Sequence, residues 1–346
     1  MAETVSKIEQ STQELVNDVL ATIERERERE IVARRFGLFD RKETLEQIGE
    51  MLGITRERVR QLEKSVVTRL KTTAEQGNVP HIQSFQAKLL EHLESMGQVA
   101  RISDLTAKLV SDPNRIEQAR TAFLAQLCPE VLVINEDDYY YHSAAILSAG
   151  SEKTVKADVA KLIETIKKLA EPKQISEIAN AAAFGDAEYA EALASISKQL
   201  ATLNGRWGLV KWPMVNPKNI RDKIYVILKE HGKHLHFNDI AKAIKDSEFK
   251  RKDVTTQAIH NELIKDKRFV LIGRGIYALK EWGYEKGTVA DIISEVLRQA
   301  AEPLHRDEIV KRVLQSRYVK ETTILLNLQG KPQFKRVAKA TYALAE

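Results

Sequence analysis

Residues 44–71 read TLEQIGEMLGITRERVRQLEKSVVTRLK, and this stretch predicts two short helices joined by a tight turn. Thr44 is followed three residues later by Gln47, which is the spacing of a capping box that satisfies free backbone N–H groups at the start of a helix. Gly53 follows the first helix, where a left-handed residue is wanted. The inner face of this helix is predicted to hold Leu45, Ile48 and Leu52.

The second helix can be capped by Thr55, and its apolar and polar residues fall on opposite faces. The face predicted to be buried holds Val59, Leu62, Val66 and Leu70. The other face holds Glu57, Arg60, Gln61 and Lys64. Two short helices joined by a glycine-containing turn form a helix-turn-helix, whose second helix enters the major groove of DNA.

Three segments of this region resemble region 4 of the sigma-70 family. They are RRFGL at 34–38, TLEQIGEMLGIT at 44–55 and RERVRQLE at 56–63, and the likeness covers about residues 25–71. The resemblance implies a helix-turn-helix that reads the upstream hexamer of a promoter and docks on the flap of bacterial RNA polymerase. The alternative is a pair of helices that only pack together.

The resemblance also implies roles for individual residues. Carried over position by position, the base-reading residues are Arg56, Glu57, Arg60 and Gln61, and the residues near the DNA backbone are Thr55, Arg58 and Lys64. The chemistry suits these roles, because Arg can donate two hydrogen bonds to guanine, Gln can pair with adenine and Glu can accept from cytosine. Charges at the edge of the face would hold phosphates and fix the register.

The segment before this region differs from a complete sigma factor. A sigma factor carries core-binding and strand-melting regions before region 4, whereas only about 24 residues precede it here. We therefore expect this chain to read DNA and recruit a partner without opening a promoter by itself. The run ERERERE at 24–30 predicts a solvated helix rather than a nucleic-acid site. A preceding helix is predicted by the spacing of Val5, Ile8, Leu15, Val16, Val19, Leu20 and Ile23.

Residues 82–346 show weak internal similarity. Four segments place an acidic residue directly before an aliphatic one, and each is followed by a helical stretch and a short strand that bears aromatic residues. The order of helices and a strand pair is that of a winged helix. The acidic and aliphatic pairs are Asp104–Leu105, Glu177–Ile178, Asp239–Ile240 and Glu308–Ile309. The predicted domains are a helix-turn-helix domain at 1–76 and winged-helix-like units at 82–150, 153–213, 217–284 and 286–346.

The third unit is the clearest. HFNDIAKAIKD at 236–246 and TTQAIHNELIKDKRFVLIGRGIYALKEWGY at 255–284 resemble the HARE-type helix-turn-helix. That winged-helix family occurs in the delta subunit of bacterial RNA polymerase, in restriction-associated proteins and in chromatin factors, so the resemblance implies binding to nucleic acid or to polymerase. Candidate contacts to the DNA backbone are Lys252, Thr255, Lys267, Arg268 and Arg274 in the third unit and Lys335 and Arg336 in the fourth. The alternative is a solvated rim on a protein-binding module.

Charge is unevenly distributed along the chain. The net charge is +5, but residues 217–346 carry 26 basic and 17 acidic side chains, a net of +9. Residues 81–216 carry 14 basic and 17 acidic side chains, a net of −3. A basic segment suits a polyanionic partner, so we expect protein contact or scaffolding from the first two units. The aromatic residues that close the units are expected to pack on their cores rather than to stack on bases; they are Trp207, Trp212, Tyr277, Trp282 and Tyr342.

Several classes of protein lack support in the sequence. No apolar run of about 18 residues and no secretory signal is present, so a cytoplasmic, nucleoid-associated protein is expected. Cys128 is the only cysteine, and we expect it to be a core residue rather than a nucleophile. Phosphate-binding loops, dinucleotide fingerprints and metal-ligand spacings are absent, so no cofactor, small-molecule substrate or enzymatic activity is expected.

These observations lead to one preferred interpretation. The fold class is mainly α, with a helix-turn-helix and tandem winged-helix units that carry small β-wings. The expected function is that of a sequence-specific DNA-binding transcription regulator or partial sigma-like factor, which reads a promoter element with the helix at 56–71 in bacterial transcription initiation. The expected partners are promoter-like double-stranded DNA and the RNA polymerase core. One alternative is a polymerase-associated interaction subunit that reads no bases. Another is the DNA-recognition component of a restriction or defence system, which would need a separate nuclease.

Overall fold

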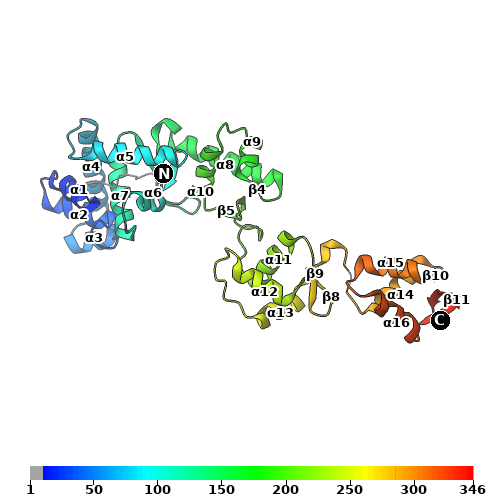
Figure 1. Cartoon of the computed structure of the whole chain (residues 1–346). Coiled ribbons are helices and arrows are strands. Elements are labelled where there is room, and N and C mark those ends of the chain that lie inside the picture. The colour runs from blue at the N-terminus through cyan, green and yellow to red at the C-terminus, as the bar shows by residue number, and fades with distance from the viewer. Residues whose placement is uncertain (1–10, 285, 346) are drawn as a thin grey trace. The chain divides into compact units, whose positions relative to one another are not determined.

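The structure is a computed structural model that describes residues 11–284 and 286–345. These residues form 16 α-helices and four antiparallel sheets of three strands each, so the expected mainly helical fold class is confirmed. The described chain divides into two compact bodies, one up to Val210 and one from Lys211 onward. Figure 1 shows the helices and small sheets along the chain. We call the two parts the N-terminal body and the C-terminal body.

The N-terminal body begins with four helices. They are α1 (Thr12–Ala21), α2 (Glu26–Phe36), α3 (Leu45–Leu52) and α4 (Arg56–Glu75). The described part of the helix expected over 5–23 is α1, which buries Leu15, Val16, Val19 and Leu20, while Ile23 is buried just after it. Val5 and Ile8 lie outside the described residues.

Four repeats follow, and all have the same order of elements: helix, short strand, helix, helix and a strand pair. Repeat 1 contains α5 (Ile82–Ser95), β1 (Val99–Arg101), α6 (Ile102–Leu109), α7 (Arg115–Leu127), β2 (Val131–Ile134) and β3 (Ser143–Ile146). Repeat 2 contains α8 (Glu152–Leu169), β4 (Lys173–Gln174), α9 (Ile175–Ala181), α10 (Ala187–Ile196), β5 (Leu200–Leu203) and β6 (Arg206–Leu209).

Repeats 3 and 4 make up the C-terminal body. Repeat 3 contains α11 (Ile220–His231), β7 (Leu235–His236), α12 (Phe237–Asp246), α13 (Thr256–Lys265), β8 (Phe269–Gly273) and β9 (Ile276–Leu279). Repeat 4 contains α14 (Val289–Ala300), β10 (Leu304–His305), α15 (Arg306–Ser316), α16 (Glu321–Gly330), β11 (Phe334–Ala338) and β12 (Thr341–Leu344). In every repeat the last strand lies in the middle of the sheet. This is the element order of a winged helix.

The repeated acidic and aliphatic pairs mark equivalent core positions. Leu105, Ile178, Ile240 and Ile309 each have a relative exposure of 0%. The closing aromatic residues also pack inward: Trp207, Tyr277 and Tyr342 are buried, and Trp212 and Trp282 are half-buried. The packing role expected for these aromatic residues is therefore supported.

The first four helices and repeat 1 share a hydrophobic core. It includes Leu15 of α1, Val66 of α4 and Phe123 of α7. Val79 belongs to the same core, although its surroundings, GNVPH at 77–81, have the composition of a flexible break. Hydrogen bonds from the Gly77 and Asn78 N–H groups to the Ala74 and Thr73 carbonyl oxygens, both at 2.9 Å, also hold this connection against the body.

Cys128 provides a simple check of this core. It is buried, its Sγ donates to the Leu124 carbonyl oxygen at 3.3 Å, and burial raises the pKa of the thiol to about 12. Because the thiolate is the reactive form, we expect no reaction with an aromatic disulfide reagent at pH 8 in the folded protein. One equivalent should react after unfolding in guanidinium chloride. Rapid reaction of the folded protein would contradict the burial.

Candidate nucleic-acid interface

Three helices, α2, α3 and α4, build the predicted helix-turn-helix around a small apolar cluster. Ile31, Ile48 and Val59 are its fully buried members, one from each helix. Leu45, Leu52, Ile54 and Leu62 pack against it. The apolar faces expected for α3 and α4 are therefore confirmed.

The capping groups also lie where the sequence places them. Thr44 Oγ1 accepts from the Gln47 backbone N–H at 3.3 Å, and Gln47 Oε1 accepts from the Thr44 N–H at 2.9 Å. Thr55 Oγ1 accepts from the Arg58 N–H at 3.2 Å and so caps α4. Gly53 adopts φ +64°, a left-handed conformation that suits glycine. These local contacts define where α3 ends and α4 begins.

A close approach inside the turn sets the position of α3 against α4. A Cβ on Gly49 would lie 2.7 Å from the Ile54 carbonyl oxygen, which is too close for any side chain. The Ile54 N–H in turn donates to the Gly49 carbonyl oxygen at 2.9 Å. The backbone of the turn thus packs directly on the helix, and a residue with a side chain at position 49 would push them apart.

The run ERERERE does more than face solvent, which corrects the expectation of a solvated helix. Glu28 is only 7% exposed, and its carboxylate lies 2.7 Å from Arg69 of α4 and 3.4 Å from Arg25. Arg27 Nη2 donates to the Leu52 carbonyl oxygen at 2.5 Å, at the end of α3. Side chains of α2 therefore anchor both helices of the motif.

The first turns of α4 present the predicted base-reading residues to solvent. Arg56, Glu57, Arg60 and Gln61 are all exposed, as are the predicted backbone residues Thr55, Arg58 and Lys64. The opposite face of the same helix is held in the core by Val59, Val66 and Leu70. The structure therefore brings all seven residues together on one open surface, which we call the α4 face.

Ion pairs arrange the long side chains of the α4 face. Arg60 binds the Glu57 carboxylate through two hydrogen bonds, Nε to Oε2 at 2.8 Å and Nη2 to Oε1 at 2.7 Å. Gln61 Nε2 donates to Glu57 Oε1 at 3.3 Å, and Arg56 Nη1 lies 2.8 Å from Glu46 Oε1. The hydrogen bonds from Arg60 lower the pKa of Glu57 to about 2, so Glu57 is ionised at neutral pH. In the free protein Glu57, Arg60 and Gln61 thus bond to one another, while Arg56 pairs with Glu46 of α3.

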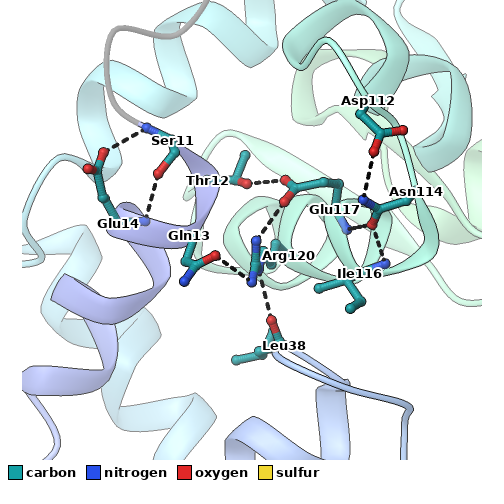
Figure 2. A network of polar contacts seen from close by, with 10 residues as sticks. All are labelled: Ser11, Thr12, Gln13, Glu14, Leu38, Asp112, Asn114, Ile116, Glu117 and Arg120. Carbon is teal, nitrogen blue, oxygen red and sulfur yellow. Dashed lines mark hydrogen bonds and ion pairs between the residues drawn. The ribbon is translucent and has the colours of Figure 1, made fainter.

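A polar network joins the helix-turn-helix region to repeat 1 (Figure 2). Arg120 of α7 donates from Nε to the Leu38 carbonyl oxygen at 2.8 Å, from Nη1 to Glu117 Oε1 at 2.6 Å and from Nη2 to Gln13 Oε1 at 3.1 Å. Thr12 Oγ1 donates to the second carboxylate oxygen of Glu117. This network was not predicted, because Arg120 lies 82 residues from Leu38 and nothing in the local pattern links them.

The candidate backbone contacts of repeats 3 and 4 are less uniform. Lys252, Thr255, Lys267 and Arg274 are exposed in repeat 3, and Lys335 and Arg336 are exposed in repeat 4. Arg268 differs from them, because it is half-buried and its Nη2 lies 2.7 Å from Asp266 and 3.1 Å from Asp222. Two carboxylates therefore already compensate the charge of Arg268.

Two further properties concern residues 11–284 and 286–345. None of their helices is long and apolar enough to cross a membrane. Within the same residues, His, Cys, Asp and Glu side chains do not gather in groups of three or more that could hold a metal ion.

Comparison with known proteins finds similarity over the helix-turn-helix. Residues 25–72 match the family model "Sigma-70, region 4". The RNA polymerase sigma factor sigB of Arabidopsis thaliana is 52% identical over 46 residues, which is 13% of this chain and 8% of that protein. The RNA polymerase sigma factor SigA of a Bacillus species is 46% identical over 59 residues, 17% of this chain and 15% of that protein. The RNA polymerase sigma factor RpoD of Helicobacter pylori is 49% identical over 49 residues, 14% of this chain and 7% of that protein.

The matched part is a small share of both this chain and its relatives. It covers 17% or less of this chain and 15% or less of each of these relatives. The HARE-type likeness of the later repeats has no counterpart among these matches and stays a prediction. The resemblance of the N-terminal segment is confirmed: residues 25–72 form a helix-turn-helix of the sigma-70 region 4 family, which supports a DNA-binding, transcription-related role.

Proposed function

We propose that this protein is a sequence-specific transcription regulator that reads a promoter-like element of double-stranded DNA with the α4 face. The observation that carries the proposal is the open face itself. Seven polar side chains of residues 55–64 are exposed on one helix whose other face is fixed in the core. A helix held in this way can enter the major groove without rearrangement of the fold.

In this proposal, Arg56, Glu57, Arg60 and Gln61 contact base edges. The ion pair between Arg60 and Glu57 is exposed, and exposed pairs contribute little stability. Exchanging it for hydrogen bonds to bases therefore costs little. Thr55, Arg58 and Lys64 border the same face and would bind phosphates, which fixes the register of the helix on the duplex.

We also propose that the protein associates with the RNA polymerase core. The similarity of residues 25–72 favours this partner, since the similar proteins are RNA polymerase sigma factors. A second candidate function follows from it: a polymerase-associated subunit in which the helix-turn-helix grips protein and reads no bases. Capture of core polymerase in the absence of DNA that depends on residues 25–71 would favour this second function.

The test of the main proposal is selection of duplexes from a random library by the full chain at two salt concentrations, followed by two single variants. We expect one motif to be enriched. Gln61→Ala should relax preference at one base pair, with a loss of about 1–3 kcal/mol of discrimination. Lys64→Ala should weaken all sequences alike and lower the slope of log affinity against log salt by about one.

Each variant serves as the control for the other, because both residues lie exposed on α4 and neither supports the core. Tight, salt-dependent binding without an enriched motif would move the assignment to the polymerase-associated function. Unchanged binding and unchanged specificity in both variants would exclude the α4 face as a DNA-reading surface.

A further inference from the structure

The four repeats use their third helix in two different ways. In repeat 1 this helix, α7, packs against α1, α2 and α4, and Arg115 is its one exposed residue. In repeat 2 the third helix, α10, packs against β1 of repeat 1, and its exposed side chains are Glu188 and Glu191. A Cβ on Gly97 would lie 2.5 Å from the Glu188 carbonyl oxygen, so the contact is tight. In the first two repeats, the third helix is therefore packed against other elements of the N-terminal body.

The third helices of the C-terminal body remain open. In repeat 3, α13 exposes Thr256, Gln257, Asn261, Ile264 and Lys265. In repeat 4, α16 exposes Glu321, Thr322, Thr323, Leu326 and Gln329. Only the C-terminal body thus has third helices available to a groove.

The net charge of the third helix and wing also distinguishes repeats 1 and 2 from repeats 3 and 4. We compare the stretch from the N-cap of the third helix to the end of the last strand, which contains the helix and the wing. Residues 114–146 carry two basic and five acidic side chains, and residues 186–209 carry two and three. Residues 255–279 carry four and two, and residues 320–344 carry five and one. The net charges are −3, −1, +2 and +4, so repeat 4 is the most basic.

The wings of repeats 3 and 4 are built on the same register but differ on their outer face. Val270 pairs with Ala278 in β8–β9, and Lys335 pairs with Ala343 in β11–β12, with a register shift two residues later in both. In repeat 3 the outer face forms a buried cluster of Val270, Ile272 and Ala278. It is covered by Trp282 and Tyr284, and Arg317 donates to the Leu271 carbonyl oxygen at 3.0 Å.

In repeat 4 the corresponding outer face is open. Lys335 replaces the buried Val270, and Val337, which corresponds to the buried Ile272, is 45% exposed. Lys331 and Lys339 at the two ends of β11 are exposed as well, and within the described residues no carboxylate forms an ion pair with Lys331, Lys335 or Lys339. The wing of repeat 4 is therefore a surface of uncompensated positive charge beside an open helix.

We propose that α16 and the β11–β12 wing of repeat 4 bind the phosphate backbone of duplex DNA without regard to sequence. The chain would then have a second DNA-binding surface besides the α4 face. Repeat 4 would supply this surface, rather than repeat 3, whose resemblance to the HARE-type family is clearer. Lys335, Arg336 and Lys339 lie against phosphates in this arrangement, and each neutralised phosphate releases counterions. Thr322, Thr323 and Gln329 of α16 add neutral hydrogen-bonding groups.

A protein partner is the competing occupant of this surface. Leu326 is 68% exposed on α16, and Val337 adds a second apolar side chain. Two isolated apolar residues are common on ordinary surfaces, whereas the charge of +4 over residues 320–344 stands out from the other repeats. The observations favour DNA, and the experiment includes the protein partner as an outcome.

The experiment compares two triple variants of the full chain. Lys335→Gln/Arg336→Gln/Lys339→Gln removes three charges from the wing. The matched control, Lys153→Gln/Lys167→Gln/Lys168→Gln, removes three charges from exposed positions of α8. Binding is measured on a random-sequence 30-base-pair duplex and on the motif selected through the α4 face, each over a range of salt concentrations.

We expect the wing variant to lose affinity on both duplexes, on the order of 100-fold at 0.1 M salt, with a salt slope lower by about three. The control variant should lose far less on either duplex. Equal behaviour of the two variants would overturn the proposal, and so would a wing variant that keeps DNA affinity but no longer captures core RNA polymerase.

The two proposals can fail separately. Gln61→Ala acts only on the selected motif, whereas the wing variant acts on both duplexes. If no motif is selected at all, the random duplex alone still tests the wing. Far-UV circular dichroism and thermal melting of both triple variants exclude loss of fold, which is not expected because the changed side chains are exposed.

Discussion

Arg120→Met is expected to lower the free energy of unfolding of the N-terminal body by about 3 kcal/mol, the scale for breaking a buried, hydrogen-bonded ion pair. Arg120 is 7% exposed and donates to Leu38, Glu117 and Gln13 (Figure 2). Methionine retains much of the side-chain volume but makes none of these bonds. The Glu117 carboxylate would lose its cation, and the Leu38 carbonyl oxygen would lose its donor.

The measurement is urea unfolding of the full chain, monitored by far-UV circular dichroism. Arg115→Met is the matched control, because Arg115 lies on the same helix and is exposed; it should change stability by less than about 0.5 kcal/mol. The double variant Arg120→Met/Glu117→Leu should recover part of the loss, since no charge is left unpaired. A loss below about 1 kcal/mol for Arg120→Met would show that the network adds little.

The helix-turn-helix could be predicted closely from the sequence because its signals are local. A capping box joins Thr44 to Gln47, and a left-handed glycine follows at Gly53. Both depend on neighbours within a few residues, which the sequence displays directly. The α4 face followed from the same periodicity, since burying Val59 and Val66 leaves Arg60 and Gln61 outside.

The repeats were predictable in outline for a similar reason. The aliphatic anchors, such as Ile240, recur at equivalent places and are all fully buried. The first strand of each sheet was missed. It is two residues long in repeats 2, 3 and 4, for example Leu235–His236, and two residues are too short to show an alternating pattern.

Contacts between distant segments could not be predicted. Glu28 is buried because Arg69 reaches it from α4, and Arg120 is buried because Leu38 and Gln13 lie over it. Neither partner is marked by spacing or composition. Contacts of the third helices with distant segments could not be predicted either. Nothing in the sequence of α7 indicates that α1, α2 and α4 cover it. Which repeats stay open to a partner therefore became visible only in the folded chain.

Gly49→Ala is expected to destabilise the helix-turn-helix by about 1–3 kcal/mol, the range for overpacking a filled site. In an open helix the same change would stabilise the protein by up to about 1 kcal/mol through helix propensity. Here the new Cβ would lie 2.7 Å from the Ile54 carbonyl oxygen. That atom belongs to the backbone of the turn, so α3 and α4 must separate to admit the methyl group.

The displacement should also reach the α4 face, because Thr55 and Arg56 directly follow Ile54. If the α4 face reads DNA as proposed, affinity for the selected motif should fall at least tenfold, a difference of about 1.4 kcal/mol. Gly330→Ala is the matched control for stability, since Gly330 also lies in a helix and nothing lies within 4 Å of its added Cβ. It should leave stability unchanged or slightly raised.

Stability and binding together decide what Gly49 does. Loss of both in Gly49→Ala, with stability kept in Gly330→Ala, would mean that the close packing of the turn on α3 sets the position of α4. Loss of stability alone would mean that α3 shifts to admit the methyl group while the position of α4 is unchanged. A variant as stable as the parent protein would contradict the close approach itself, because a backbone contact of this kind cannot be relieved by a side-chain rotation.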